Sequence, residues 1–198
     1  IPFDLTPGSS TKANKINCFE FEYSHGLATQ YIGTENGLYI IRPEDSYWRI
    51  KLEGLNVVSI IIPEGYRNTT IYAATRGESY CDGIYASKDR GSTWEKIYSA
   101  KNIVSLAPAV PYAEIMTVVP QFYMAIYNKG VYESRNGGYS WRDITDNLSE
   151  KKMTCLTVDR IDPEIAYLGT ENGIYYYQNT DYSEYDLWRT AIGLKIFF

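Results

Sequence analysis

The four tryptophans of this chain recur at nearly constant spacing. Trp48, Trp94, Trp141 and Trp188 lie 46, 47 and 47 residues apart. A residue type that is used once per period of this size is typical of repeat architectures such as propellers and solenoids. The chain is therefore expected to stack four similar units rather than to build one irregular core.

Each period contains the same succession of short strand-like runs. A Gly-aliphatic-Tyr triplet occurs at residues 37–39, 83–85, 130–132 and 173–175. The run before it opens on a tyrosine in each copy, namely Tyr31, Tyr72, Tyr123 and Tyr167. The first run of each copy is apolar around one small residue, namely Cys18, Ser59, Ser105 and Cys155. Runs rich in Ile, Val, Tyr and Thr suit strands, and Asn-Gly or Asp-Gly between them suits hairpin turns.

These runs predict an all-β protein made of four four-stranded repeats of about 46 residues. The repeats are expected over residues 16–55, 56–102, 103–152 and 153–194. Because repeat units share their interfaces, all four belong to a single domain that spans residues 1–198.

A local motif surrounds two of the tryptophans. Residues 87–94 (SKDRGSTW) and 134–141 (SRNGGYSW) share the pattern Ser-x-Asp/Asn-x-Gly-x-Ser/Thr-Trp. The pattern resembles the Asp-box, or BNR repeat, of β-propellers, which include sialidases, sortilin-type receptors, xyloglucanases and a photosystem II assembly factor. Asp89 and Asn136 are expected to accept backbone N–H bonds within the loop, and each tryptophan is expected to cover its loop and pack into the next blade. The resemblance implies a β-propeller.

The number of blades in the ring is left open by the sequence. Propellers have about four to eight blades, so four repeats form either a closed four-bladed ring or part of a larger one. Residues 1–8 resemble the end of a preceding repeat, and residues 195–198 resemble the first strand of a following one. We therefore expect an incomplete or self-associating ring, because open repeat ends expose apolar surface and free strand edges.

Composition argues against several functions. The formal net charge is −5 and no basic run occurs, so the attraction that drives non-specific nucleic-acid binding is missing. No apolar stretch approaches the roughly 18 residues of a membrane span. One histidine, His25, and three scattered cysteines match no zinc spacing, and we expect neither a metal nor a cofactor. The cysteines do not fix the compartment, and an extracellular or cell-surface location is favoured over the cytoplasm.

One face of the predicted propeller carries the candidate binding residues. The turns between the second and third strands share this face with the connections between blades. It comprises residues 8–15, 35–36, 54–56, 76–82, 99–102, 146–152 and 171–172. The candidate contact residues are Glu35, Asn36, Arg76, Tyr80, Asp82, Glu171 and Asn172. On this basis the chain is expected to be a non-catalytic binding or scaffold module that presents these loops to a protein partner.

The alternative is a carbohydrate-active protein, either a lectin or a glycoside hydrolase. Glycosidases use a pair of carboxyl groups, and Glu35 and Glu171 occupy equivalent places in two Thr-Glu-Asn-Gly segments. A sialidase would need three arginines around a carboxylate, whereas Arg76 alone lies on the predicted face. We therefore expect no enzymatic activity, with glycoside hydrolysis as the catalytic alternative.

Overall fold

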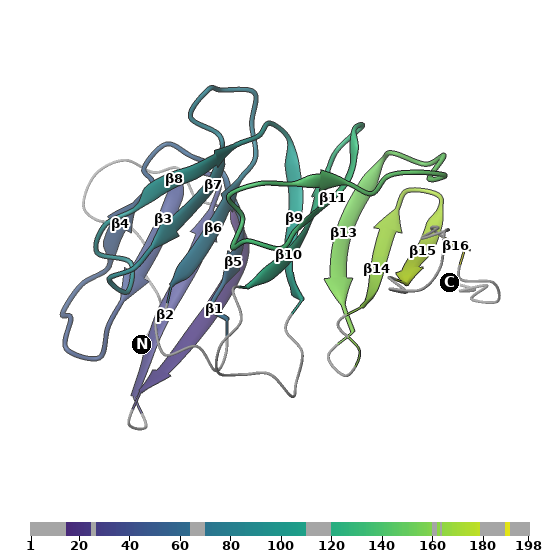
Figure 1. Ribbon diagram of the computed structural model, residues 1–198. Coiled ribbons are helices and arrows are strands. Elements are labelled where there is room, and N and C mark those ends of the chain that lie inside the picture. The colour runs from purple at the N-terminus through teal and green to yellow at the C-terminus, as the bar shows by residue number, and fades with distance from the viewer. Residues whose placement is uncertain are drawn as a thin grey trace, which may run out of the picture.

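The computed structural model describes residues 15–24, 27–63, 70–109, 120–159, 162, 164–178 and 189–190. Over these residues the regular secondary structure is entirely β, as predicted (Figure 1). Four antiparallel four-stranded sheets, here called blades one to four, follow one another along the chain. Blade one contains β1 (Ile16–Ser24), β2 (Leu27–Thr34), β3 (Gly37–Ile41) and β4 (Arg49–Lys51); blade two contains β5 (Val57–Ile61), β6 (Ile71–Thr75), β7 (Gly83–Ser87) and β8 (Glu95–Ser99). Blade three contains β9 (Ile103–Ala109), β10 (Gln121–Ile126), β11 (Gly130–Ser134) and β12 (Arg142–Asp143); blade four contains β13 (Met153–Val158), β14 (Ile165–Thr170), β15 (Gly173–Gln178) and β16 (Arg189–Thr190).

Tight turns join the second and third strands of blades one and four. The Thr34 hydroxyl donates to the Gly37 carbonyl at 2.9 Å and accepts from the Asn36 amide at 3.1 Å. Thr170 makes the same two hydrogen bonds around Gly173, at 3.0 and 3.2 Å. Gly37 has a φ of +132°, a conformation that glycine adopts at little cost. The Thr-Glu-Asn-Gly segments therefore form the hairpin turns that the sequence predicts.

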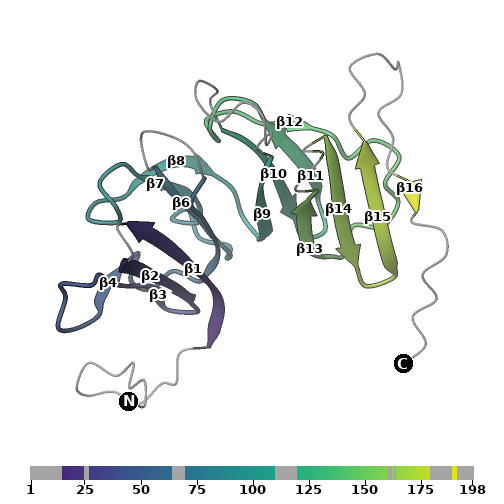
Figure 2. The ribbon, with the colours of Figure 1, turned by 90° about the horizontal axis from the view of Figure 1, so that it is seen from below.

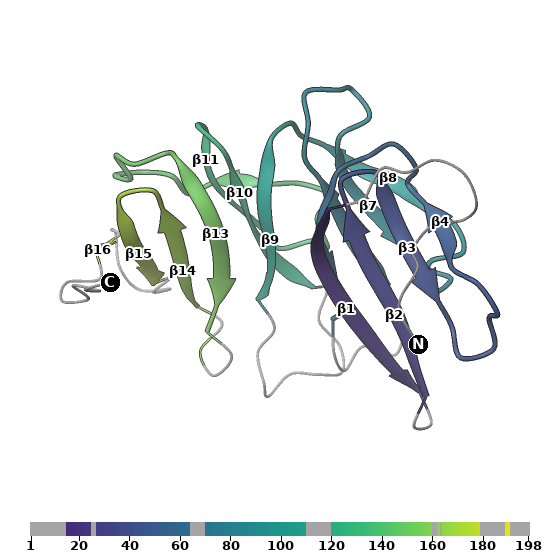
Figure 3. The same cartoon turned by 180° about the vertical axis from the view of Figure 1, so that it is seen from behind.

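The blades are arranged side by side through their first strands. β1 lies beside β5, β5 beside β9, and β9 beside β13. Figure 2 shows the four blades along an open arc, with blade one and blade four at its two ends. The view from behind shows β9 and β13 next to each other (Figure 3). The predicted architecture of four four-stranded blades is confirmed, and the described residues form an arc that is not closed.

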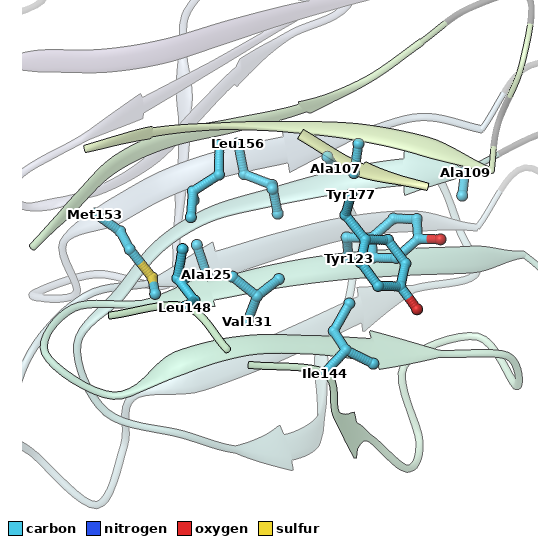
Figure 4. Close-up of a cluster of buried hydrophobic side chains, with 12 residues drawn as sticks. Ala107, Ala109, Tyr123, Ala125, Val131, Ile144, Leu148, Met153, Leu156 and Tyr177 are labelled. Atoms are coloured by element: carbon cyan, nitrogen blue, oxygen red, sulfur yellow. The ribbon is translucent and has the colours of Figure 1, made fainter. Parts of the chain in front are cut away.

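Apolar clusters fill the spaces between successive blades. Tyr31 and Leu38 of blade one pack with Val57 of blade two, and all three side chains are fully buried. Figure 4 shows the cluster between blades three and four, where the Tyr123 and Tyr177 ring centroids lie 6.2 Å apart in an edge-to-face arrangement. Because buried apolar area is the main favourable term in folding, the interfaces between blades hold the structure together.

The loops of the Ser-x-Asp/Asn-x-Gly-x-Ser/Thr-Trp pattern are closed by side-chain hydrogen bonds. Asp89 accepts from the Thr93 amide at 2.8 Å and from the Thr93 hydroxyl at 2.6 Å. These two bonds, with a third from the Ser87 hydroxyl, lower the pKa of Asp89 to about 2. Asn136 accepts from the Ser140 amide at 2.9 Å in the equivalent loop. The loops therefore have the hydrogen bonds that the pattern predicts.

The tryptophans of these two loops pack in the opposite direction from the prediction. Trp94 of blade two packs against the cluster that blades one and two share, and its indole N–H donates to the Gly91 carbonyl at 3.2 Å. The ring of Trp141 in blade three lies 5.9 Å from that of Tyr98 in blade two. The prediction that each tryptophan packs into the next blade was wrong, because the two loops lie over the preceding blade. Trp188 lies outside the described residues.

Candidate binding face

Backbone hydrogen bonds connect the loops of the predicted face. The Arg76 amide donates to the Asn56 carbonyl at 2.8 Å, which ties the β6–β7 loop to the connection between blades one and two. The Glu171 amide donates to the Lys152 carbonyl at 3.0 Å, which ties the β14–β15 turn to the connection between blades three and four. In Figure 1 the β14–β15 turn lies on the upper side of the molecule. These bonds between main-chain atoms fix the loops against the connections between blades.

A hollow of about 440 Å³ opens on this face between blades two and three. Two of the predicted residues, Tyr80 and Asp82, line it. The complete lining is Ser79, Tyr80, Asp82, Ser99, Ala100, Lys101, Asn102, Ile126, Tyr127, Asn128 and Lys129. The segment 126–129, which includes the β10–β11 turn, was missed by the sequence analysis. Its residues match no binding motif. Two signals were available: the segment is equivalent to the other turns between second and third strands, and Tyr127 is a tyrosine outside the repeat positions.

The β6–β7 loop contains three candidate residues, Arg76, Tyr80 and Asp82, of which the last two have different roles. Asp82 is buried and accepts from the Ser79 amide at 2.8 Å, so its carboxylate orders the loop. Gly77 packs directly against that carboxylate, where a Cβ atom would collide with it. Tyr80, by contrast, is 85% exposed. The Lys96 ammonium donates to the Tyr80 carbonyl and so holds the backbone behind the ring.

Charged and aromatic groups extend along the face from blade two to blade four. The Arg76 guanidinium lies over the Tyr127 ring, 5.8 Å from its centroid, which is within the range of a cation–π contact. The Tyr127 hydroxyl donates to Glu171 at 3.5 Å. Lys152 pairs with Glu171 at 3.2 Å, and this pairing raises the pKa of Lys152. Arg76 and Glu171, both predicted site residues, are thus connected through Tyr127.

The remaining predicted residues belong to the turns of blades one and four. Glu35 pairs with Lys15 at 3.8 Å. Asn172 donates to Glu150, whose pKa is lowered by the Lys152 amide and by this hydrogen bond. Asn36 is exposed beside Glu35. Glu35 and Glu171 therefore each have a lysine partner, and their turns stand on the two end blades, with two blades between them (Figure 2).

The described residues offer no arrangement of three or more His, Cys, Asp or Glu side chains that could hold a metal ion. His25 lies outside these residues. Within the same part of the chain, no helix has the length and apolar character that crossing a membrane requires.

No family model matches the sequence, and no curated protein matches it closely. Solved structures match the fold. A GH74 enzyme from Niastella koreensis has a TM-score of 0.69 and 16% identity over 93% of this chain. The extracellular domain of BT4673 from B. thetaiotaomicron has a TM-score of 0.61 and 15% identity over 85%. An auxiliary nutrient binding protein from Bacteroides ovatus has a TM-score of 0.54 and 13% identity over 77%.

This chain spans 32%, 21% and 36% of the lengths of those three proteins, respectively. At these identities the likeness extends to the fold, and the fold agrees with the four radially arranged blades and with the loops that resemble Asp-boxes. The chain therefore has a β-propeller fold, and its described residues form four consecutive blades.

Proposed function

We propose that this chain is a non-catalytic binding module that receives a protein partner on its loop face. The observation that carries the proposal is the hollow between blades two and three, with the 85% exposed Tyr80 in its lining. Tyrosine is enriched among the residues that dominate binding energy at protein interfaces. The backbone bonds between loops also favour binding, because a preordered surface loses little entropy when a partner docks.

The lining of the hollow indicates the chemistry of the partner. Lys129 supplies positive charge, and Arg76 adds a second cation above the Tyr127 ring. Lys101 also lines the hollow, where it pairs with Glu78 at 3.9 Å. Asn102 is tied into the surface through a hydrogen bond to Glu78. A partner segment with a carboxylate beside an apolar side chain fits these groups, since the carboxylate can meet the cations while the apolar group packs on Tyr80.

The placement of the two candidate carboxylates favours binding over hydrolysis. A glycosidase holds its two carboxyl groups about 5–10 Å apart across the scissile bond. Glu35 and Glu171 stand on the two end blades, and each is paired with a lysine. One structural neighbour is named as a nutrient binding protein and another as an extracellular domain, which supports a binding role and an extracellular location. Self-association, the other partner that the sequence suggests, would use the sheet faces of the end blades.

The test compares two exposed tyrosines. Tyr80→Ala removes the proposed anchor, and Tyr139→Ala removes an exposed tyrosine from the β11–β12 loop of blade three. Proteins captured from an extract of the source cells by the parent chain are quantified by mass spectrometry and then purified for titration. We expect Tyr80→Ala to weaken binding of a captured protein by roughly 10- to 30-fold, as loss of an interface anchor does, and Tyr139→Ala to leave it unchanged. Equal affinities for the parent and Tyr80→Ala would contradict the proposal.

The carbohydrate alternative rests on the two aromatic rings of the hollow, Tyr80 and Tyr127, and on the GH74 neighbour. Aromatic faces beside polar groups suit ligand recognition in general. A soluble oligosaccharide that bound the parent chain but not Tyr80→Ala would favour this alternative. Turnover of a glycoside that Glu35→Gln and Glu171→Gln each abolish would establish hydrolysis.

A further inference from the structure

Every blade has two sheet faces, one toward the preceding blade and one toward the following blade. We call these the leading and the trailing face. Three interfaces, between blades one and two, two and three, and three and four, each join a trailing face to a leading face. The leading face of blade one and the trailing face of blade four stand at the ends of the arc (Figure 2).

The leading face of blade one keeps apolar side chains at the positions that are buried in the other blades. Ile16 and Phe19 on β1 are 50% and 67% exposed. The residues equivalent to Ile16 are Val57, Ile103 and Met153, which are 0–1% exposed. The residues equivalent to Phe19 are Ile60, Leu106 and Leu156, which are 5–8% exposed. Blade one therefore carries the residues of a blade interface, and no other blade of the described residues covers them.

Aromatic rings enlarge this exposed surface along β1. The Phe19 and Phe21 ring centroids lie 5.8 Å apart, and those of Phe21 and Tyr23 lie 6.3 Å apart. All three side chains are exposed, and they lie on the same face of β1. Contiguous apolar patches of this kind on soluble proteins usually mark interaction sites.

The trailing face of blade four shows the complementary pattern. Tyr167 on β14 is 37% exposed, whereas the equivalent Tyr31, Tyr72 and Tyr123 are 0–5% exposed. Ile174 on β15 is 40% exposed, whereas the equivalent Leu38, Ile84 and Val131 are fully buried. In the first three blades these residues pack on the leading face of the following blade. Blade four therefore presents the other half of the same interface.

We propose that a second copy of this chain covers both faces, so that two chains close a ring of eight blades. The trailing face of blade four in each copy would pack on the leading face of blade one in the other. The same interface between blades occurs three times within the chain. The two end faces are complementary because each keeps the apolar residues of one half of that interface. A head-to-tail contact of this kind forms a closed ring when the rotation between copies closes, and eight blades lie within the range of known propellers.

The repeat also predicts a specific contact between the copies. The Ser59 hydroxyl accepts from the Leu106 amide at 3.1 Å, and the Ser105 hydroxyl donates to the Leu156 carbonyl at 3.2 Å. Both contacts cross from the first strand of one blade to the first strand of the next. Cys155, a free and exposed thiol, occupies the equivalent place in blade four. In the first interface the Cys18 thiol lies 3.9 Å from the carbonyl of Val57, the equivalent of Ile16. The Cys155 thiol should therefore lie against the β1 backbone of the partner subunit over residues 16–19.

The first experiment measures the mass of the chain by sedimentation equilibrium over a range of concentrations. The parent chain is expected at about twice 22.7 kDa. Phe19→Arg and Ile174→Arg should each give a single-chain mass, because a buried unpaired charge opposes either half of the interface. Both side chains are exposed in one copy, so neither change should unfold the chain, which circular dichroism verifies. Tyr139→Arg, at an exposed tyrosine of blade three, should keep the two-chain mass.

An equimolar mixture of Phe19→Arg and Ile174→Arg separates the head-to-tail contact from a symmetric one. The trailing face of the first variant and the leading face of the second are both unchanged, so one intact interface forms and two-chain species should return in the mixture. A single-chain mass for the parent at every concentration would overturn the proposal, because no second copy would then cover the end faces. Assemblies larger than two chains would overturn the closed ring of eight blades.

A cysteine cross-link tests the contact directly. In a chain that carries Phe19→Cys, Cys18→Ser and Cys81→Ser, oxidation should join two copies through Cys155 and give a two-chain band on a non-reducing gel. The further change Cys155→Ser should abolish that band. Failure to cross-link under conditions in which the same chain has a two-chain mass would contradict the proposed contact.

Discussion

Gly91 of blade two lies directly against Ile40 of blade one. A Cβ atom at Gly91 would come within 2.6 Å of the Ile40 Cδ1 atom, and the φ of Gly91 is +80°. The glycine therefore permits both the turn of its own loop and the close approach of that loop to the preceding blade. This relationship explains why a loop motif contributes to packing between blades.

Gly91→Ala should lower the free energy of unfolding by about 2–4 kcal/mol. About 1–2 kcal/mol comes from the left-handed backbone, and the rest from crowding against Ile40. Gly54→Ala is the matched control, because Gly54 has a φ of +79° but no atom within 4 Å of its added Cβ. The decrease in the free energy of unfolding of Gly54→Ala should come from the backbone strain alone. Urea unfolding measures both variants, and equal losses would mean that the contact with Ile40 contributes nothing.

Asp89 should make the stability of blade two depend on acid pH. Hydrogen bonds from Thr93 lower the pKa of its carboxyl from 3.8 to about 2, so the ionised form is favoured by folding. The resulting stabilisation is complete above about pH 4 and is lost as the pH falls through about 2. Asp89→Asn removes this dependence while keeping the acceptor, as Asn136 does in blade three. Thermal unfolding of both chains between about pH 5 and pH 2 should show a steeper decline for the parent; parallel curves would contradict the assignment.

Cys18 should react far more slowly with iodoacetamide than Cys155. Burial raises the pKa of the Cys18 thiol to about 12, so only about one molecule in 10⁴ carries the reactive thiolate near pH 8. Cys155 is exposed. Mass spectrometry after timed labelling of the Phe19→Arg chain compares the two sites under conditions in which the end faces are open. Similar rates would show that β1 does not pack on blade two as described.

The sequence could predict the strands and turns because the local signals repeat with the same period. It could not predict the direction in which Trp94 packs, because the motif defines the loop but not the blade over which the loop leans. The place of Tyr127 in the hollow could not be predicted either. As a tyrosine outside the repeat positions it was a candidate for an exposed side chain, but the hollow arises from the spacing of two blades. Repeat alignment shows that Ile174 is equivalent to Leu38, yet only the structure shows which of the two is covered.

The central claim is that each blade is stabilised by the blade that follows it. Tyr123 and Tyr167 occupy the same repeat position, but blade four covers Tyr123 whereas Tyr167 lies on the open trailing face. Urea unfolding of Tyr123→Ala and Tyr167→Ala, both made in the Phe19→Arg chain to keep the end faces open, tests this claim most directly. We predict losses of about 3–5 kcal/mol for Tyr123→Ala and less than about 1 kcal/mol for Tyr167→Ala. Equal losses at the two positions would contradict the packing of successive blades described above.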